Sequence, residues 1–159
     1  MRPALAIDTD RGVWLRAPCS LTQVCAVVDD TTPPHLVTAL TERFGNAPQF
    51  SLLELHAPDE LHAQWLASFE AEAAAPARHP VDVDRLLAPL PPGCVLALCS
   101  QAVDKLDWLG SVTGLSCRPI ALHAADRAAS LDDSQTAHAL DAVGAIWMET
   151  LTAQFGGER

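Results

Sequence analysis

The chain has 159 residues, of which 49% are hydrophobic and 19% charged, so we expect one folded domain over residues 1–159 and not a disordered segment. Twenty acidic residues against ten basic ones give a formal net charge of −10, which disfavours nucleic acid or an anionic membrane as the main partner. The sequence has neither a leader pattern nor an apolar run of membrane-spanning length, which predicts a cytoplasmic protein with no membrane partner. Low lysine with many alanine, arginine and proline residues is typical of a GC-rich bacterial genome.

The first third of the chain predicts strands followed by a helix. Apolar runs at residues 4–8, 13–16 and 24–28 predict three strands, and the turn-forming residues between the first two make these a hairpin. The third run would complete an antiparallel meander. Pro33 and Pro34 suit the first turn of a helix. The apolar positions of this helix fall on one face: Leu36, Val37, Leu40 and Phe44.

The middle of the chain predicts one more strand and its helices. Residues 50–55 form a fourth apolar run, and Pro58 with two acidic residues after it opens a helix. The apolar side chains of this helix repeat along one stripe: Leu61, Trp65, Leu66 and Phe69. Residues 71–93 are rich in alanine and proline and predict a long surface connection, with one short helix around residues 83–87, and not a domain boundary.

Residues 94–123 predict a strand, a helix and a second strand parallel to the first. Neither of the two apolar runs alternates with polar residues, so both strands should be buried on both faces. Residues 130–134 have the composition of a helix cap, and the glycines at 156–157 end the last predicted helix.

Together these elements predict an α/β fold in a single domain. We expect a mixed sheet of about six strands, with the N-terminal antiparallel meander followed by βαβ units and with helices on both faces. The order of the elements resembles the ribonuclease H and actin-like architecture, and a Rossmann-like order is the alternative. This resemblance concerns the fold alone, because one fold hosts many activities.

Asp8 and Asp10 form the sharpest local motif, Ala-Ile-Asp-Thr-Asp-Arg-Gly, at the end of the first apolar run. It resembles the first motif of the haloacid dehalogenase-type phosphatases, which implies Asp8 as nucleophile, Asp10 as general acid and Mg²⁺ as the cofactor. The same resemblance implies Ser100 as the phosphate-binding hydroxyl, Lys105 as the cation, and Asp132 or Asp133 as a metal ligand. The alternative that we favour is a polar hairpin turn, since Asp and Gly are common in turns.

A second metal hypothesis follows from the ribonuclease H-like layout. A two-metal phosphodiester site needs several carboxylates that converge from neighbouring elements. The candidates are Asp8, Glu54, Asp104 and Asp107. A nuclease must also hold a polyanion, for which the chain has few cations, so we favour the alternative that Asp104 and Asp107 form the solvated face of a helix.

The five cysteines are an odd number without a Cys-x-x-Cys pair, which predicts reduced core residues. Cys99 is the candidate nucleophile among them, because it lies where a strand ends and a helix is predicted to begin. His123 and Asp126 could then serve as base and as orienting carboxylate. No nucleophile-elbow motif surrounds Cys99, so a core cysteine is the favoured alternative.

The favoured function is a non-enzymatic, acidic protein-binding module, such as an adaptor, an assembly factor or an immunity-type protein. The motifs do not add up to a catalytic signature, and a net charge of −10 would speed encounter with a basic protein partner. Trp14 beside Arg16 is the candidate interface anchor, because one face of the predicted hairpin should be exposed.

Two alternatives remain. One is a metal-dependent phosphoryl-transfer enzyme, phosphatase-like or nuclease-like, that uses Asp8 and Asp10. The other, lesser alternative is a subunit like psi of the bacterial replicative polymerase clamp loader. The segment Val-Trp-Leu-Arg-Ala-Pro at residues 13–18 resembles that subunit, and the resemblance implies an N-terminal segment that docks a partner. The sequence leaves open the partner, the strand order and the oligomeric state.

Overall fold

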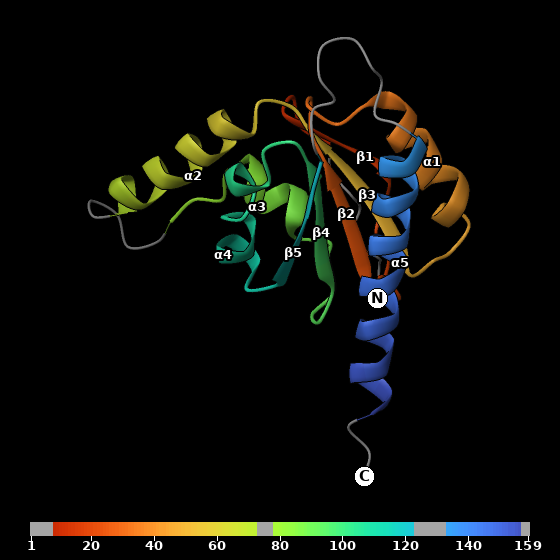
Figure 1. The fold of residues 1–159 in the computed structure, drawn as a ribbon. Helices are drawn as coiled ribbons and strands as arrows, with labels where there is room; N and C mark the ends of the chain where they lie inside the picture. The colour runs from red at the N-terminus through yellow and green to blue at the C-terminus, as the bar shows by residue number, and fades with distance from the viewer. Residues whose placement is uncertain (1–7, 73–77, 123–132, 157–159) are drawn as a thin grey trace.

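The computed structural model describes residues 8–72, 78–122 and 133–156 (Figure 1). Its strands are β1 (Gly12–Arg16), β2 (Val24–Val28), β3 (Phe50–Leu55), β4 (Val95–Ser100) and β5 (Ser116–Ala121). Its helices are α1 (Pro34–Phe44), α2 (Pro58–Glu72), α3 (Asp82–Leu87), the 3₁₀ turn η1 (Val103–Lys105), α4 (Leu109–Thr113) and α5 (Asp133–Phe155). Among these described helices, none combines the length and the apolar character that crossing a membrane requires.

The five strands form one mixed sheet in the order β1-β3-β2-β4-β5. Four of them, β3, β2, β4 and β5, are parallel, and β1 runs antiparallel to β3 at one edge. Val24 at the start of β2 is in register with Phe50 on one side and with Val95 on the other. The chain leaves β2 toward β3, and it returns through α2 and α3 to β4 on the opposite side of β2.

The predicted α/β class, with a mixed sheet and helices, is confirmed, whereas the N-terminal meander is wrong. β3 lies between β1 and β2, so the strands at residues 12–16 and 24–28 are not neighbours. The crossover through α1 places β3 directly beside β2. In the predicted meander, β1 would have been the neighbour of β2 at this position. The strand predicted at residues 4–8 falls, except for Asp8, outside the described residues, and the described sheet has five strands where about six were expected.

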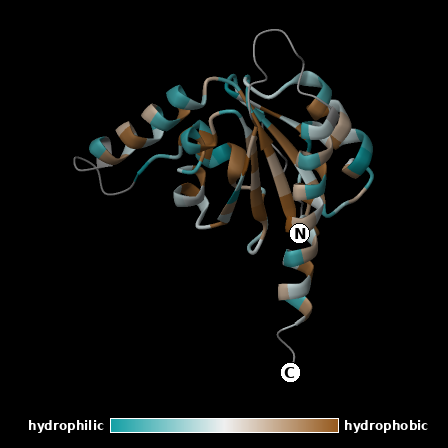
Figure 2. Ribbon diagram, viewed as in Figure 1, coloured by the Kyte–Doolittle hydropathy of each residue, from teal (hydrophilic) through white to brown (hydrophobic). Residues whose placement is uncertain are grey.

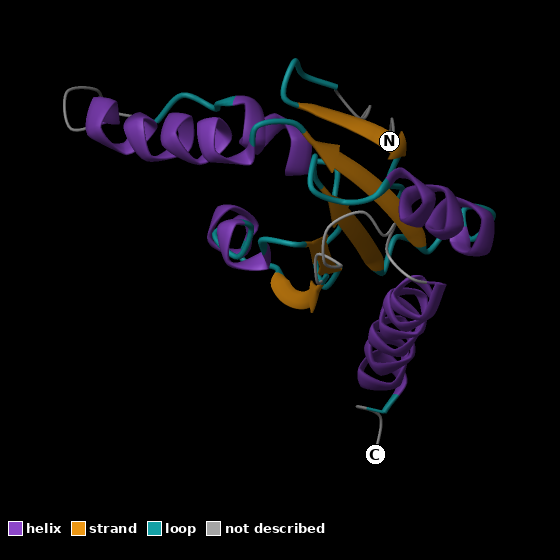
Figure 3. Ribbon diagram, turned by 45° about the horizontal axis from the view of Figure 1, so that its top comes forward, coloured by secondary structure: helices purple, strands orange, loops and turns teal. Residues whose placement is uncertain are grey.

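The sheet separates two hydrophobic clusters, one on each face. Successive side chains of a strand point to opposite faces, so Cys25 and Val27 of β2 face one cluster while Ala26 and Val28 face the other. The first cluster is covered by α2, α3 and α4, and the second by α1 and α5 (Figure 3). The central strands β2 and β4 are accordingly hydrophobic along most of their length in Figure 2. The prediction that both apolar runs of residues 94–123 are buried on both faces is confirmed for β4 and wrong for β5, which lies at the edge of the sheet with most of its residues exposed.

The segment between β4 and β5 differs from its prediction. The single helix expected from Val103 onward is divided into η1 and α4. Gly110 lies inside α4, where an added Cβ would be only 3.1 Å from Cys117 Sγ of β5, and Gly114 ends the helix with a φ of 72°. A left-handed residue suits the position after a helix, and glycine adopts it without strain.

Both edges of the sheet are protected against the addition of another strand. At the β5 edge, Leu122 donates its N–H to Ser100 of β4. Because N–H groups alternate in direction along a strand, Pro119 falls on the outward side, where it removes a donor from the edge. At the β1 edge, the Asp8 carboxylate accepts the N–H of Trp14 at 2.8 Å. An incoming strand would thus miss a donor at each edge.

Candidate binding site at the carboxyl edge of the sheet

The candidate site lies where the carboxyl ends of β2 and β4 meet. The chain continues from β2 toward β3 on one side and from β4 toward β5 on the other, so the connections diverge, and a cavity lies where they do. In open α/β sheets, ligands bind in the crevice at this topological switch point. The residues that follow these two strands therefore decide what this part of the molecule can bind.

Asp29, directly after β2, is the central polar residue of the crevice and is only 5% exposed. Its Oδ1 accepts hydrogen bonds from the Thr31 hydroxyl at 2.6 Å and from the Thr31 N–H at 3.0 Å. Its Oδ2 accepts a hydrogen bond from the Ser100 hydroxyl at 2.6 Å. Both carboxylate oxygens are thus engaged, as a buried charged group requires.

The hydroxyl groups around Asp29 also hold the backbone of the next loop. Ser100 Oγ accepts the Ala102 N–H at 2.9 Å, and Thr31 Oγ1 accepts the Gln101 N–H at 3.1 Å. The Thr32 hydroxyl donates its proton to the Cys99 carbonyl at 2.7 Å, the shortest of its three contacts. Each hydroxyl donates once, so the network joins the end of β2 to the end of β4, and each carboxylate oxygen of Asp29 accepts at least one hydrogen bond.

A cavity of about 310 Å³ opens beside this network. Its walls come from residues 29–31 after β2, from residues 57–60 at the start of α2, and from Ala102 and Lys105 after β4. Ala57 adopts a positive φ of 52°, a left-handed conformation that non-glycine residues rarely take. This conformation turns the chain from β3 into α2, so that the helix begins at the rim of the cavity.

The rim of the cavity is strongly acidic. We call its exposed carboxylates the acidic edge: Asp30, Asp59 and Glu60. Two cations lie among them, and both are engaged: Lys105 Nζ is 3.4 Å from Asp59, and Arg11 Nε is 3.0 Å from Glu60. Arg11 also reaches Asp82 at 3.6 Å. The acidic edge therefore carries an excess of negative charge.

The structure does not gather the predicted metal ligands around one point. Asp8 is engaged with the Trp14 N–H, and Asp10 is exposed in the turn before β1. Glu54 Oε1 lies 2.6 Å from His56 Nε2. Asp104 and Asp107 are exposed on and just after η1. Among the described residues, which include these five, no group of three or more His, Cys, Asp or Glu side chains is arranged to hold a metal ion, and the further candidate Asp132 lies outside the described residues.

Cys99 is a core residue on the face that α1 and α5 cover. Burial raises the pKa of its thiol to about 12, whereas an activated nucleophile needs a lowered pKa. The helix expected directly after it is replaced by a turn, with η1 starting only at Val103. Its proposed partners, His123 and Asp126, lie outside the described residues.

Trp14, predicted as an interface anchor, is instead a core side chain. It is 8% exposed and belongs to the cluster beneath α2 and α3, because it shares its face of the sheet with Leu53 and Leu55 of β3. Its neighbour Leu15 points to the other side and is 44% exposed. Arg16 is half-buried at the end of β1.

The hydroxyl network around Asp29 is the feature that sequence reasoning missed. Thr31 and Thr32 directly precede the prolines that were expected to begin a helix, and the residue before α1 is Pro33, which makes no side-chain capping bond. Asp29 and Ser100 stand at the ends of two apolar runs, which is a usable signal. Polar residues at the ends of two buried parallel strands meet at the same edge if the strands are neighbours.

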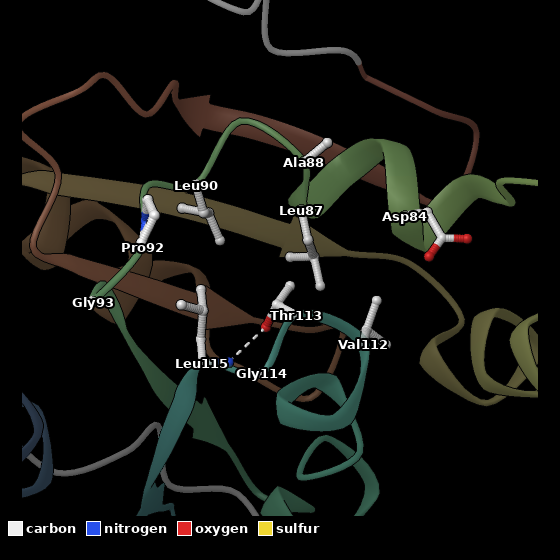
Figure 4. A pocket seen from close by; sticks show the side chains of 10 residues that line it. All are labelled: Asp84, Leu87, Ala88, Leu90, Pro92, Gly93, Val112, Thr113, Gly114 and Leu115. Carbon is white, nitrogen blue, oxygen red and sulfur yellow. Dashed lines mark hydrogen bonds between the residues drawn. The ribbon is translucent and has the colours of Figure 1, made fainter.

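A second hollow, of about 430 Å³, lies between α3 and α4 (Figure 4). Four apolar side chains contribute to its wall: Leu87, Leu90, Val112 and Leu115. Asp84 at its side is bonded through both carboxylate oxygens to Arg78 at 2.8 Å, and Arg78 also donates to Ser68 of α2. Burial raises the pKa of Asp84, but the hydrogen bonds from Arg78 and from the Val81 N–H together lower it by more than burial raises it. The pKa of Asp84 therefore lies below its usual value. This ion pair joins α2 to α3.

Comparisons of the chain with protein-family models, with curated proteins and with solved structures found no match. A function must therefore be inferred from the residues of this chain. Its strongest local feature is the acidic edge around the cavity that adjoins Asp29.

Replacing Asp29 by Ala is expected to lower the free energy of unfolding by about 2–3 kcal/mol. The reason is that the buried hydroxyls of Thr31 and Ser100 lose a charged acceptor. Urea unfolding measures the change. Asp30→Ala is the matched control, because Asp30 is exposed, and should stay within about 0.5 kcal/mol of the wild type. Equal losses in the two variants would contradict the role given to Asp29.

Thiol reactivity tests the assignment of Cys99 to the core. With a disulfide reagent at mildly alkaline pH, Cys19 is expected to react at once, since it is exposed, while Cys99 reacts slower by about 1,000-fold or more, through unfolding. The pKa of the thiol is raised from 9.0 to about 12 in the folded state, so stability should fall as the pH rises from about 9 toward 12. Rapid labelling of Cys99 in the folded protein, located by peptide mass spectrometry, would show the assignment to be wrong.

Proposed function

We propose that this chain is a non-enzymatic protein-binding module that docks a basic protein partner at the acidic edge. The observation that carries the proposal is the concentration of exposed carboxylates around the cavity at the switch point, against the two engaged cations Arg11 and Lys105. A surface of one sign attracts a partner of the opposite sign over several ångströms and raises the rate of association.

The bonding of the buried groups supports binding over catalysis. Asp29 is the carboxylate best placed in the crevice, and its oxygens already accept hydrogen bonds from Thr31 and Ser100. Cys99, the candidate nucleophile, is buried and has a raised pKa. The exposed carboxylates of the acidic edge, in contrast, can exchange solvent or the surface ion pairs of Asp59 and Glu60 for the cations of a partner without any rearrangement of the core.

The protected sheet edges favour the acidic edge as the docking surface. Pro119 and Asp8 interfere with strand addition at β5 and β1, so a partner that extends the sheet would lack hydrogen-bond donors there. A partner that presents lysine or arginine side chains would instead form ion pairs with Asp30, Asp59 and Glu60. Such exposed pairs are individually weak, so affinity depends on several of them acting together.

Binding of a fluorescein-labelled decalysine peptide tests the proposal by fluorescence anisotropy. The wild type should bind with an affinity that falls with added NaCl, because the contacts are ionic. A variant with Asp30→Asn, Asp59→Asn and Glu60→Gln should bind about tenfold more weakly.

The control changes the net charge equally on another surface. Glu42→Gln, Asp141→Asn and Glu149→Gln remove three exposed carboxylates from α1 and α5. This variant should keep nearly the wild-type affinity. If both triple variants weaken binding to the same extent, the peptide responds to net charge alone and the acidic edge is not the docking surface.

The alternative function, metal-dependent phosphoryl transfer through Asp8 and Asp10, makes the opposite prediction for metal titration. Under the binding proposal, Mg²⁺ and Mn²⁺ leave the melting temperature of the wild type and of Asp8→Asn unchanged, since no ion is bound to the folded state. The side-chain carbonyl introduced by Asp8→Asn can still accept the Trp14 N–H, so the substitution should preserve the fold. A rise of the melting temperature in the wild type that is lost in Asp8→Asn would contradict the proposal and support the phosphoryl-transfer enzyme.

A further inference from the structure

The last helix, α5, extends past the amino ends of the strands (Figure 1). One face packs on the sheet through Ala139, Val143 and Ile146. Near its end, the Trp147 indole donates to Gln23 Oε1 at 2.7 Å, and Gln23 donates to Gln154 at 2.9 Å. The residue before β2 therefore fixes the final turns of the helix in place.

The opposite face of these turns is apolar and exposed. Four exposed residues follow one another at intervals of three, four and three: Ala145, Met148, Thr152 and Phe155. Met148 is 62% exposed and Phe155 is 76% exposed. The Thr152 hydroxyl donates to the Met148 carbonyl of its own helix, so its polar atom is already engaged. We call these four residues the α5 seam, because the spacing is that of helices that pack side by side.

The region of the seam is also nearly uncharged. Between Ala142 and Gly156, Glu149 is the one ionisable residue in the sequence. Its carboxylate is 2.7 Å from Arg118 of β5, which balances its charge. On a chain with a net charge of −10, a second copy that packs on these turns therefore meets little repulsion from them.

We propose that the α5 seam is a self-association surface that packs antiparallel against the same seam of a second copy. With the two-fold axis near position 150, Ala145 of each copy faces Phe155 of the other, and Met148 faces Thr152. Each large side chain thus meets a small one, which is the complementarity that an isologous interface requires. The large and the small side chains that pair in this way belong to the same helix. The partner that fits the seam is therefore a second copy of that helix.

This arrangement is compatible with the rest of the molecule. The seam lies at the amino end of the strands, and the acidic edge lies at their carboxyl end, so a two-fold axis at the seam keeps the two acidic edges apart. The contact joins helices and not strands, in keeping with the protected edges of the sheet. A seam of four residues is small for a stable interface, so the dimer should be weak and dependent on concentration. Self-association at the seam does not depend on the proposed function.

Sedimentation equilibrium of the full chain tests the proposal. The average mass should rise from 16.9 kDa toward twice that value as the concentration approaches about 1 mM. Ala145→Glu should hold the protein at the monomer mass, because it places a carboxylate against Phe155 of the other copy. Ala63→Glu is the control with the same change of charge, at an exposed position of α2, and should dimerise as the wild type does.

Disulfide trapping tests the antiparallel register. In a background with Cys19→Ser, the double variant Ala145→Cys and Phe155→Cys should form covalent dimers on oxidation, and each single variant should not. The two positions are ten residues apart, about 15 Å along the helix, so they cannot bond within one chain. A monomer at every concentration, a dimer that survives Ala145→Glu, or equal cross-linking by the single variants would each overturn the proposal.

Discussion

The carboxylate of Asp29 joins the two central strands of the sheet, and the arrangement of the candidate site depends on it. Through the hydroxyls of Ser100 and Thr31 it links the end of β4 to the end of β2 and also fixes the first backbone amides of the loop after β4. A buried carboxylate is tolerated only when its oxygens accept hydrogen bonds, so Asp29 needs the hydroxyl groups around it. The buried hydroxyl groups in turn need Asp29 as their acceptor. The crevice beside them is consequently lined by residues that hydrogen bonds connect to the ends of β2 and β4.

The surface of the molecule is divided according to charge. Exposed carboxylates collect where the parallel strands end, and the last turns of α5, at the other end of the sheet, carry one carboxylate that is paired with Arg118. Attraction of a basic partner and association with a second copy are therefore proposed for opposite ends of the same sheet, where they need not compete. Between them, Asp8 and Pro119 reduce the capacity of the outer strands to pair with other chains.

The residues that suggested chemistry each have a structural role in the fold. Asp8 binds the Trp14 N–H at the β1 edge, Glu54 faces His56, and Cys99 fills the core beneath α1 and α5. In each case the residue type that a catalytic site would use is also the type that the local position needs: an acceptor at an edge, a charged partner on a half-buried strand, and a small apolar side chain in the core. The contacts of these residues, which the sequence does not contain, distinguish the two interpretations.

The sequence by itself determined the elements: the apolar runs of β2 and β4 without polar alternation, the start of α1 and α2 at prolines, and the surface charge. These are local properties, because strand burial follows from the pattern along one run and helix starts follow from a few adjacent residues. The tertiary structure decided the order of the strands, and with it the neighbours of each polar residue. No local pattern states that β3 lies between β1 and β2, or that Asp29 and Ser100, 71 residues apart, share a hydrogen bond. The pairing of distant strands is fixed by the burial of both faces of the whole sheet, which is a property of the complete chain and not of any segment of it.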